Sequence, residues 1–253
     1  MQITEIIEEK LNEIEKKENV KILHAVESGS RAWGFASPDS DYDVRFIYIR
    51  KKEDYLKLNE ERDVIEWQLD EVLDINGWDL KKALQHFHKS NATLFEWSNS
   101  PIVYRTTKEW QDIYNTAKGY FSIKSAMYHY YGTANGNFRE YLQEEEVKYK
   151  KYFYVIRPLL ACKYIEEKAA PPPVLFEELM KLKLPDEIEG EIKKLLVLKA
   201  NTPETGKGQR IEILNHYIEE ELSFYKEHIN LLEDDRKAEW DVLNRLFLQM
   251  LSL

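Results

Sequence analysis

Two aspartates at the start of an apolar run are the residues of this chain whose types and spacing could do chemistry. Asp41 and Asp43 stand two residues apart, where Tyr42 to Ile49 is rich in β-branched and aromatic side chains. Because side chains of a strand alternate between its faces, the two carboxylates should project from the same face. Two adjacent anions repel and raise each other's pKa unless a cation neutralises them. The pattern favours divalent metal, since Mg²⁺ binds through one or two carboxylates together with substrate phosphates.

A glycine–serine turn precedes these aspartates. Gly29 and Ser30 follow a short β-leaning run, Val20 to Val26, and Gly29 stands twelve residues before Asp41. Glycine lets the backbone approach a phosphate, and turn N–H groups with a serine hydroxyl can bind its oxygens. Arg31 could add a charge-assisted contact. Taken singly, these features are typical of a plain loop, of solvated surface charge and of a surface pair between Arg31 and Asp39, so the joint spacing carries the interpretation.

The elements that must position these residues change in type along the chain. Apolar periodicity predicts a helix over 3–17. Short apolar runs predict strands over 20–26, 42–49, 64–69 and 72–75. Residues 31–40 are predicted to form a loop, and the pair Asp70-Glu71 separates the last two strands. After Gly77 the pattern changes to helix: Asp79 and Asn91 should cap helices, and Thr106 with Glu109 forms a capping-box pattern.

From about residue 107 the pattern is helical, with breaks expected at Gly119, Gly132/Gly136, Pro171–Pro173, Pro185 and 201–208, of which the proline run and 202–208 resemble loops between helices. The predicted fold class is therefore α+β: a small mixed β-sheet core with helices, followed by an all-helical C-terminal domain. We place the domains at 1–105 and 106–253.

Composition bounds the class of protein. The chain has 253 residues, of which 43% are hydrophobic, so it can bury a sizeable core, and its net charge is −10. That charge disfavours a broad nucleic-acid-binding face but leaves room for a local basic cleft. Cys162 is the single cysteine, which excludes an intrachain disulfide. We see no signal peptide and no membrane-spanning run, and expect a cytoplasmic protein.

The segment from Gly29 to Phe46 resembles the signature of polymerase β-type nucleotidyltransferases, in which Gly-Ser is followed after about ten residues by Asp-x-Asp. More closely, it is similar to the RNA-ligase-associated nucleotidyltransferases. Three later segments, 74–84, 91–101 and 151–159, strengthen the resemblance, which covers most of the first 180 residues.

The resemblance implies a third carboxylate on a neighbouring strand. Asp74 is our choice, because it sits in the apolar run Val72-Leu73-Asp74-Ile75, where an unpaired aspartate would be costly. Asp79 is the rival, although a helix N-cap explains it well, and Glu66 and Asp70 are weaker candidates. The resemblance also implies triphosphate contacts from the helical half, for which Lys151 and Arg157 are candidates; surface charge and a buried ion pair are their structural alternatives.

The implied reaction is nucleotidyl transfer from a nucleoside triphosphate to a hydroxyl, with release of pyrophosphate. Asp41, Asp43 and Asp74 would hold two Mg²⁺ ions, or Mn²⁺, and Gly29, Ser30 and Arg31 would bind the triphosphate. The acceptor stays open: RNA-repair association suggests an RNA end, whereas the acidic charge favours a protein or a small molecule. A non-catalytic nucleotide-binding or toxin-neutralising partner is the alternative function, and a helical interaction protein would leave residues 29–43 unexplained.

Overall fold

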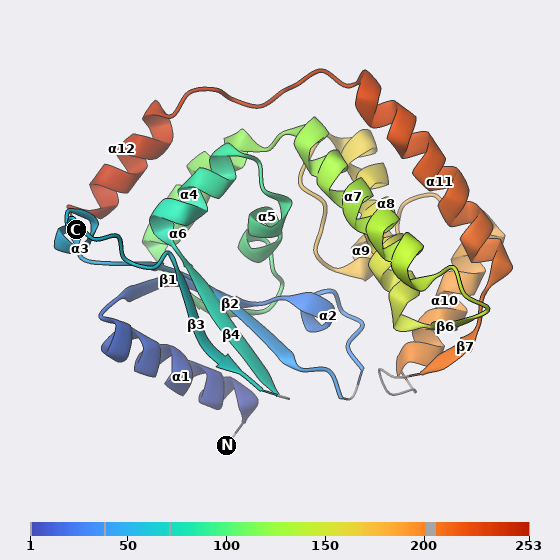
Figure 1. The fold of residues 1–253 in the computed structure, drawn as a ribbon, viewed down its shortest axis with the longest axis horizontal. Helices are drawn as coiled ribbons and strands as arrows, with labels where there is room; N and C mark the ends of the chain where they lie inside the picture. The colour runs from blue at the N-terminus through green and yellow to red at the C-terminus, as the bar shows by residue number, and fades with distance from the viewer. Residues whose placement is uncertain (1, 38, 71, 201–205, 253) are drawn as a thin grey trace. The chain divides into compact units, whose positions relative to one another are not determined.

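The computed structural model describes residues 2–37, 39–70, 72–200 and 206–252, and these form two compact units (Figure 1). The first unit comprises Met1–Ala32, Asp41–Phe121 and Arg236–Leu253. The second comprises Trp33–Ser40 and Ser122–Asp235. A mixed sheet with helices in the N-terminal part and a mostly helical C-terminal region confirm the predicted fold class.

The first unit is built on a five-stranded sheet of order β3-β4-β2-β1-β5. The pairing of β2 with β4 is parallel, and the other three pairings are antiparallel. The strands are β1 (Lys21–Glu27), β2 (Tyr42–Ile49), β3 (Val64–Leu69), β4 (Leu73–Asp79) and β5 (Val103–Thr106).

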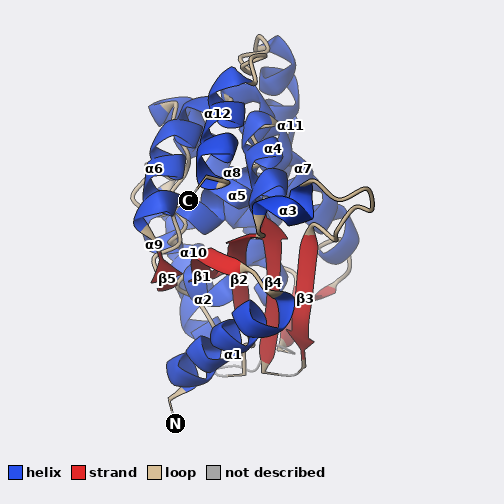
Figure 2. Cartoon of the chain, turned by 90° about the vertical axis from the view of Figure 1, so that its left-hand side faces the viewer, coloured by secondary structure: helices blue, strands red, loops and turns tan. Residues whose placement is uncertain are grey.

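Helices cover both faces of this sheet (Figure 2). One face packs against α1 (Ile3–Glu18), and the other packs against α4 (Leu80–His88), α5 (Ala92–Ser98), α6 (Lys108–Ala117) and α12 (Asp241–Met250). The unit is completed by the short helices α2 (Gly29–Ala32), α3 (Lys52–Tyr55) and η1 (Lys118–Tyr120).

The alternation along β2 decides which face carries the polar residues. Val44, Phe46 and Tyr48 belong to the core under α1, whereas Ile47 and Ile49 belong to the core under α4. Since strand side chains alternate, Asp43 and Arg45 share the face of Ile47. By the same rule on β4, Asp74 and Asn76 share the face of Trp78, which packs against the α4 side.

The second unit consists of helices with a small two-stranded sheet. Its helices are α7 (Ile123–Tyr141), α8 (Lys150–Lys168), α9 (Phe176–Leu179), α10 (Asp186–Ala200) and α11 (Glu212–Leu231), and its strands are β6 (Glu146–Lys148) and β7 (Lys207–Gln209). Segment Trp33–Ser40 is part of this unit: the ring of Phe35 lies 4.9 Å from that of Phe153 and 5.5 Å from that of Phe176. The predicted loop after the glycine–serine turn is thus held by aromatic packing.

Most predicted elements of the first 100 residues are confirmed. The helix at 3–17 is α1, and the strands at 42–49 and 64–69 have the predicted bounds. Asp79 caps α4 by accepting a hydrogen bond of 2.8 Å from the N–H of Lys81, and Asn91 caps α5 by accepting one of 3.2 Å from that of Leu94. These caps were predictable because side-chain oxygens satisfy the free N–H groups of a first helical turn.

Other element predictions are wrong. The strand predicted over 72–75 is too short, because β4 continues through Gly77 to Asp79. A Cβ at Gly77 would lie 2.2 Å from the ring of Phe46, so glycine there allows close packing in the sheet. Gly132 and Gly136 do not break α7, since both lie inside it on its exposed side.

The remaining differences concern the regions after residue 100. The cap of α6 is Thr107 in place of Thr106, which ends the unpredicted strand β5. The predicted loop over 202–208 contains part of β7. Residues 202–205 of that loop lie outside the described residues. Pro38 and Glu71, which belong to the loop over 31–40 and the pair before β4, lie outside them as well. The two compact units do not match a division of the chain at residue 105, because α6 and α12 belong to the unit that contains the five-stranded sheet. The domain boundary stays a prediction.

None of the helices in the described part of the chain combines the length and the apolar composition that crossing a bilayer requires.

Candidate active site

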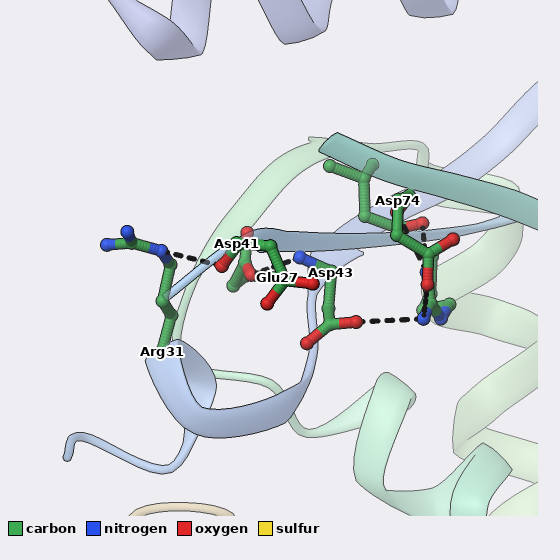
Figure 3. Close-up of polar contacts among 7 residues, drawn as sticks. Glu27, Arg31, Asp41, Asp43 and Asp74 are labelled. Atoms are coloured by element: carbon green, nitrogen blue, oxygen red, sulfur yellow. Dashed lines mark hydrogen bonds and ion pairs between the residues drawn. The ribbon is translucent and has the colours of Figure 1, made fainter. Parts of the chain in front are cut away.

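Asp43 and Asp74 lie side by side on the two parallel strands of the sheet (Figure 3). They are Cα partners in the register of β2 with β4. Both side chains are partly exposed, at 25% for Asp43 and 23% for Asp74. Asp41 comes immediately before β2 and is exposed, with no hydrogen bond or ion pair of its carboxylate to any other described residue. The structure therefore brings the sequence-predicted aspartates to one end of one strand pair.

Arg45 binds both paired aspartates. Its Nη2 donates to Oδ1 of Asp43 at 2.9 Å and to Oδ2 of Asp74 at 2.6 Å. Its Nη1 donates to the backbone oxygen of Asp74 at 2.8 Å and to that of Val44 at 3.1 Å. Charge-assisted bonds of this kind offset the repulsion between two neighbouring carboxylates. Sequence reasoning missed Arg45, although its place two residues after Asp43 on a strand puts it on the same face.

Gly29 provides the space that the carboxylate of Asp43 fills. Its φ is +59°, and a Cβ added there would lie 2.0 Å from Oδ2 of Asp43. The N–H of Ser28 donates to the backbone oxygen of Asp43 at 2.8 Å, which fixes the turn against β2. Any side chain at position 29 would thus displace Asp43, and glycine is required for both its conformation and its size. Ser30 is buried in the first turn of α2.

Glu27 is a further carboxylate at this site that sequence reasoning did not single out. It is 1% exposed, and its Oε1 accepts a hydrogen bond of 2.8 Å from the backbone N–H of Asp43. The hydroxyl of Tyr104 donates to its Oε2. Burial raises the pKa of Glu27, and the Tyr104 bond opposes this shift. The available signal was a glutamate that ends the apolar strand run immediately before the glycine–serine turn.

Arg31 is positioned by the same segment. Its Nε donates to the backbone oxygen of Asp41 at 2.9 Å, and its guanidinium carbon lies 3.7 Å from the centre of the Tyr42 ring. These contacts hold the chain just before β2. A contact of Arg31 with a triphosphate stays a prediction.

The rival third carboxylate, Asp79, lies at the other end of β4, where its Cα partner is Tyr48. It is 3% exposed, caps α4 and accepts a hydrogen bond of 2.8 Å from the hydroxyl of Tyr55. Burial raises its pKa. A pocket of about 700 Å³ at that end includes Asp79 in its lining and none of Asp41, Asp43 and Asp74. Asp79 is thus at the opposite end of β4 from Asp74, and the choice of Asp74 as the third carboxylate stays a prediction.

The two weaker candidates lie outside the strand pair β2–β4 that carries Asp43 and Asp74. Glu66, on β3, is exposed and has Asn76 as its Cα partner. Asp70 follows β3, and its Oδ1 accepts from the N–H groups of Val72 and Leu73, each at 2.8 Å. Asp70 therefore holds the connection between β3 and β4.

Lys151 and Arg157 belong to α8 in the second unit. The Nζ of Lys151 lies 3.4 Å from the centre of the Tyr141 ring. Arg157 is 4% exposed, its Nη2 donates to the backbone oxygen of Val174 at 3.3 Å, and its guanidinium carbon lies 4.5 Å from the centre of the Trp33 ring. Arg157 thus holds the segment that begins at Trp33, and triphosphate contacts of either residue stay predictions.

Comparison with known proteins decides the family of this chain. Residues 3–249 match the model of a family described as RlaP, RNA repair pathway DNA polymerase beta family. The chain belongs to the RlaP family. The match confirms the resemblance to polymerase β-type nucleotidyltransferases.

Two individual proteins are similar to this chain. The RlaP chain is 45% identical over 248 residues to a Bacillus subtilis (strain 168) protein named Uncharacterized protein YcgL, which covers 96% of this chain and 94% of that one. It is also similar to the crystal structure of a nucleotidyltransferase-like protein from Exiguobacterium sibiricum 255-15, with 14% identity and a TM-score of 0.33 over 88% of this chain and 74% of the other.

Polymerase β family proteins typically use divalent metal ions, and the donor set of this RlaP protein fits such an ion in part. Oxygen ligands suit Mg²⁺, and the carboxylates of Asp41 and Asp43 supply them, with Oδ2 of Asp43 seated in the space left by Gly29. Among the described residues, no group of three or more histidine, cysteine, aspartate or glutamate side chains is arranged to hold a metal. Asp74, the third predicted ligand, forms an ion pair with Arg45 in this structure.

Proposed function

We propose that this RlaP protein is a metal-dependent nucleotidyltransferase. It transfers a nucleoside monophosphate group from a nucleoside triphosphate to an acceptor hydroxyl, and pyrophosphate leaves. The observation that carries the proposal is the Asp43–Asp74 register pair on β2 and β4, packed against the turn at Gly29. Membership of the polymerase β family supports the reaction class.

Each residue of the site has a proposed role. Gly29 and Ser30 receive the triphosphate, because the N–H groups of a turn and a serine hydroxyl can bind phosphate oxygens. Asp41 and Asp43 hold two Mg²⁺ ions, or Mn²⁺, with Asp74 as a further ligand or as the acceptor of the hydroxyl proton. When bound, these ions would neutralise phosphate charge and lower the pKa of the attacking hydroxyl.

Buried Glu27 acts indirectly. By accepting the N–H of Asp43, it fixes the backbone from which that carboxylate projects. Tyr104 in turn holds Glu27 from β5. Positioning of this kind matters because small displacements of a reacting group cost much of the rate.

The acceptor is proposed to be an RNA end in the cytoplasm. The family description supports this choice through its RNA repair pathway. The net charge of −10 opposes long stretches of phosphate backbone, so contact with a short terminal segment agrees best with both observations.

Two linked measurements test the proposal. The first is thermal stabilisation by each nucleoside triphosphate with and without Mg²⁺, since a ligand at a hundred times its Kd stabilises by about 2.7 kcal/mol. The second is release of pyrophosphate with RNA carrying a free terminal hydroxyl. We expect both signals from the wild type and neither from Asp41→Ala/Asp43→Ala.

Matched carboxylate variants make the assignment specific. Asp43→Asn and Asp74→Asn should abolish transfer, whereas Glu66→Gln on the same sheet should retain it. Transfer by Asp43→Asn at the wild-type rate would refute the site. Nucleotide binding without turnover on any acceptor would favour the non-catalytic partner protein.

A further inference from the structure

Asn76 carries an unusual buried atom beside the aspartate pair. It is the Cα partner of Arg45 in the pairing of β4 with β2, and it shares the face of Asp74. Its Oδ1 is buried and has no hydrogen-bond partner among the described residues. A buried acceptor without a partner is costly, and in native structures such an atom calls for an explanation.

Arg45 is the residue of β2 that lies opposite Asn76 on the same face of the sheet. Neighbouring strands lie about 4.8 Å apart, and paired residues on one face of a sheet contact each other. In the structure, Nη2 of Arg45 binds Asp43 and Asp74, while Nη1 binds the backbone oxygens of Asp74 and Val44. The bonds of Nη1 do not involve a carboxylate, so an ion that takes the carboxylate oxygens removes only the contacts of Nη2.

We propose that Arg45 is a positioning residue that exchanges between the Asp43–Asp74 pair and Asn76 when a divalent ion binds the aspartates. This inference rests on the proposed function. The guanidinium and the ion compete for the same carboxylate oxygens, and an arginine side chain that is 14% exposed cannot leave them without another acceptor. Oδ1 of Asn76 provides that acceptor, so Arg45 and Asn76 together set the affinity for the ion.

Two substitutions should therefore change metal affinity in opposite directions. Arg45→Gln removes the competing cation, and we expect Mn²⁺ to bind about tenfold more tightly. Asn76→Leu keeps the size of the side chain but removes the acceptor, and we expect Mn²⁺ to bind about fivefold more weakly. In the double variant, the Asn76→Leu effect should disappear, because no guanidinium remains to be moved.

The readout is the electron paramagnetic resonance signal of free Mn²⁺, titrated into the full-length protein without nucleotide. Circular dichroism melting checks that each variant is folded. Glu66→Gln, on β3 directly opposite Asn76, is the matched control, and its expected affinity equals that of the wild type. If Arg45→Gln does not fold, the comparison of Asn76→Leu with the wild type decides alone.

The outcomes separate this inference from the proposed function. Wild-type affinity in Asn76→Leu, or weaker binding by Arg45→Gln, would overturn the exchange of Arg45. If Mn²⁺ binding to the wild type is nonetheless lost in Asp41→Ala/Asp43→Ala, the proposed metal site stands without it. Absence of Mn²⁺ binding in wild type and variants alike would overturn both.

Discussion

At the scale of single residues, the candidate site depends on Gly29 as much as on its carboxylates. The position requires a positive φ and has no room for a Cβ beside Asp43. Gly29→Ala should lower the free energy of unfolding by at least about 1–2 kcal/mol from the backbone alone, and Mn²⁺ binding should be lost with the displaced carboxylate. Urea denaturation and the Mn²⁺ titration measure the two effects.

A matched glycine controls for the change of residue type. Gly136 lies on the exposed side of α7 with nothing within 4 Å of an added Cβ. Gly136→Ala should stabilise the protein by about 0.5–1 kcal/mol, because alanine is the better helix former. Equal effects of the two substitutions would argue against the close approach of Gly29 to Asp43.

His24 gives the sheet a pH-dependent stability. It is buried. Its Nε2 donates to the backbone oxygen of Trp97 and its Nδ1 contacts the hydroxyl of Thr106, so a neutral ring satisfies both contacts. Burial lowers the pKa of His24 to about 4. The unfolded chain therefore binds the proton more readily between pH 6.5 and 4, and the free energy of unfolding should fall over this range as pH falls, by about 3 kcal/mol in total.

The variant His24→Gln isolates this contribution, because the side-chain amide of glutamine supplies an N–H donor but does not titrate. Urea denaturation of both proteins from pH 7 to 4 gives the difference between their stabilities. Burial raises the pKa values of Asp79 and Glu27, which act in the opposite sense, but both proteins share them. A difference that does not change with pH would contradict the buried neutral histidine.

At the scale of elements, Asp79 and Asp74 have separable roles on the same strand. Asp79→Ala removes the cap of α4 and the bond from Tyr55, and should cost about 1–2 kcal/mol of stability while transfer is retained. Asp74→Asn should do the reverse: little loss of stability and no transfer. Thermal melting and pyrophosphate release, measured on both variants, check these two expectations. Loss of transfer in a folded Asp79→Ala variant would indicate that Asp79, and not Asp74, is the third carboxylate.

The sequence allowed those elements to be predicted whose signals are local. Apolar periodicity predicted α1, and the cap residues Asp79 and Asn91 predicted the starts of two helices. Strand β5 was missed because its pairing partner β1 is distant in sequence. The passage of β4 through Gly77 was missed because it depends on packing against Phe46 of β2. Asp43 was predicted from its motif. The ion pair between Arg45 and Asp74 depends on the register of β2 with β4, which no local sequence pattern reveals.

At the scale of the whole molecule, the sheet unit draws on both ends of the chain. Leu243 of α12 is 2% exposed and belongs to the core cluster that contains Leu80 and Phe87 of α4. Leu243→Ala should cost about 2–5 kcal/mol. Hydrogen exchange followed by mass spectrometry should show faster exchange in α4 of this unit and unchanged exchange in α11 of the other.

Another leucine of the same helix is the control. Leu248 is 62% exposed, so Leu248→Ala should change stability by less than about 0.5 kcal/mol. Faster exchange in both units of Leu243→Ala would show that the units unfold together.

The place of α12 in the first unit has a consequence for biosynthesis. Chains leave the ribosome from the N-terminus, at about 5–20 residues per second, and early domains generally fold first. Here the core around α4 stays open until residues 241–250 have emerged, although the strands that carry Asp43 and Asp74 were made long before. The packing of α4 against the sheet is therefore expected to be completed only after helices α7 to α11 of the second unit have already been synthesised.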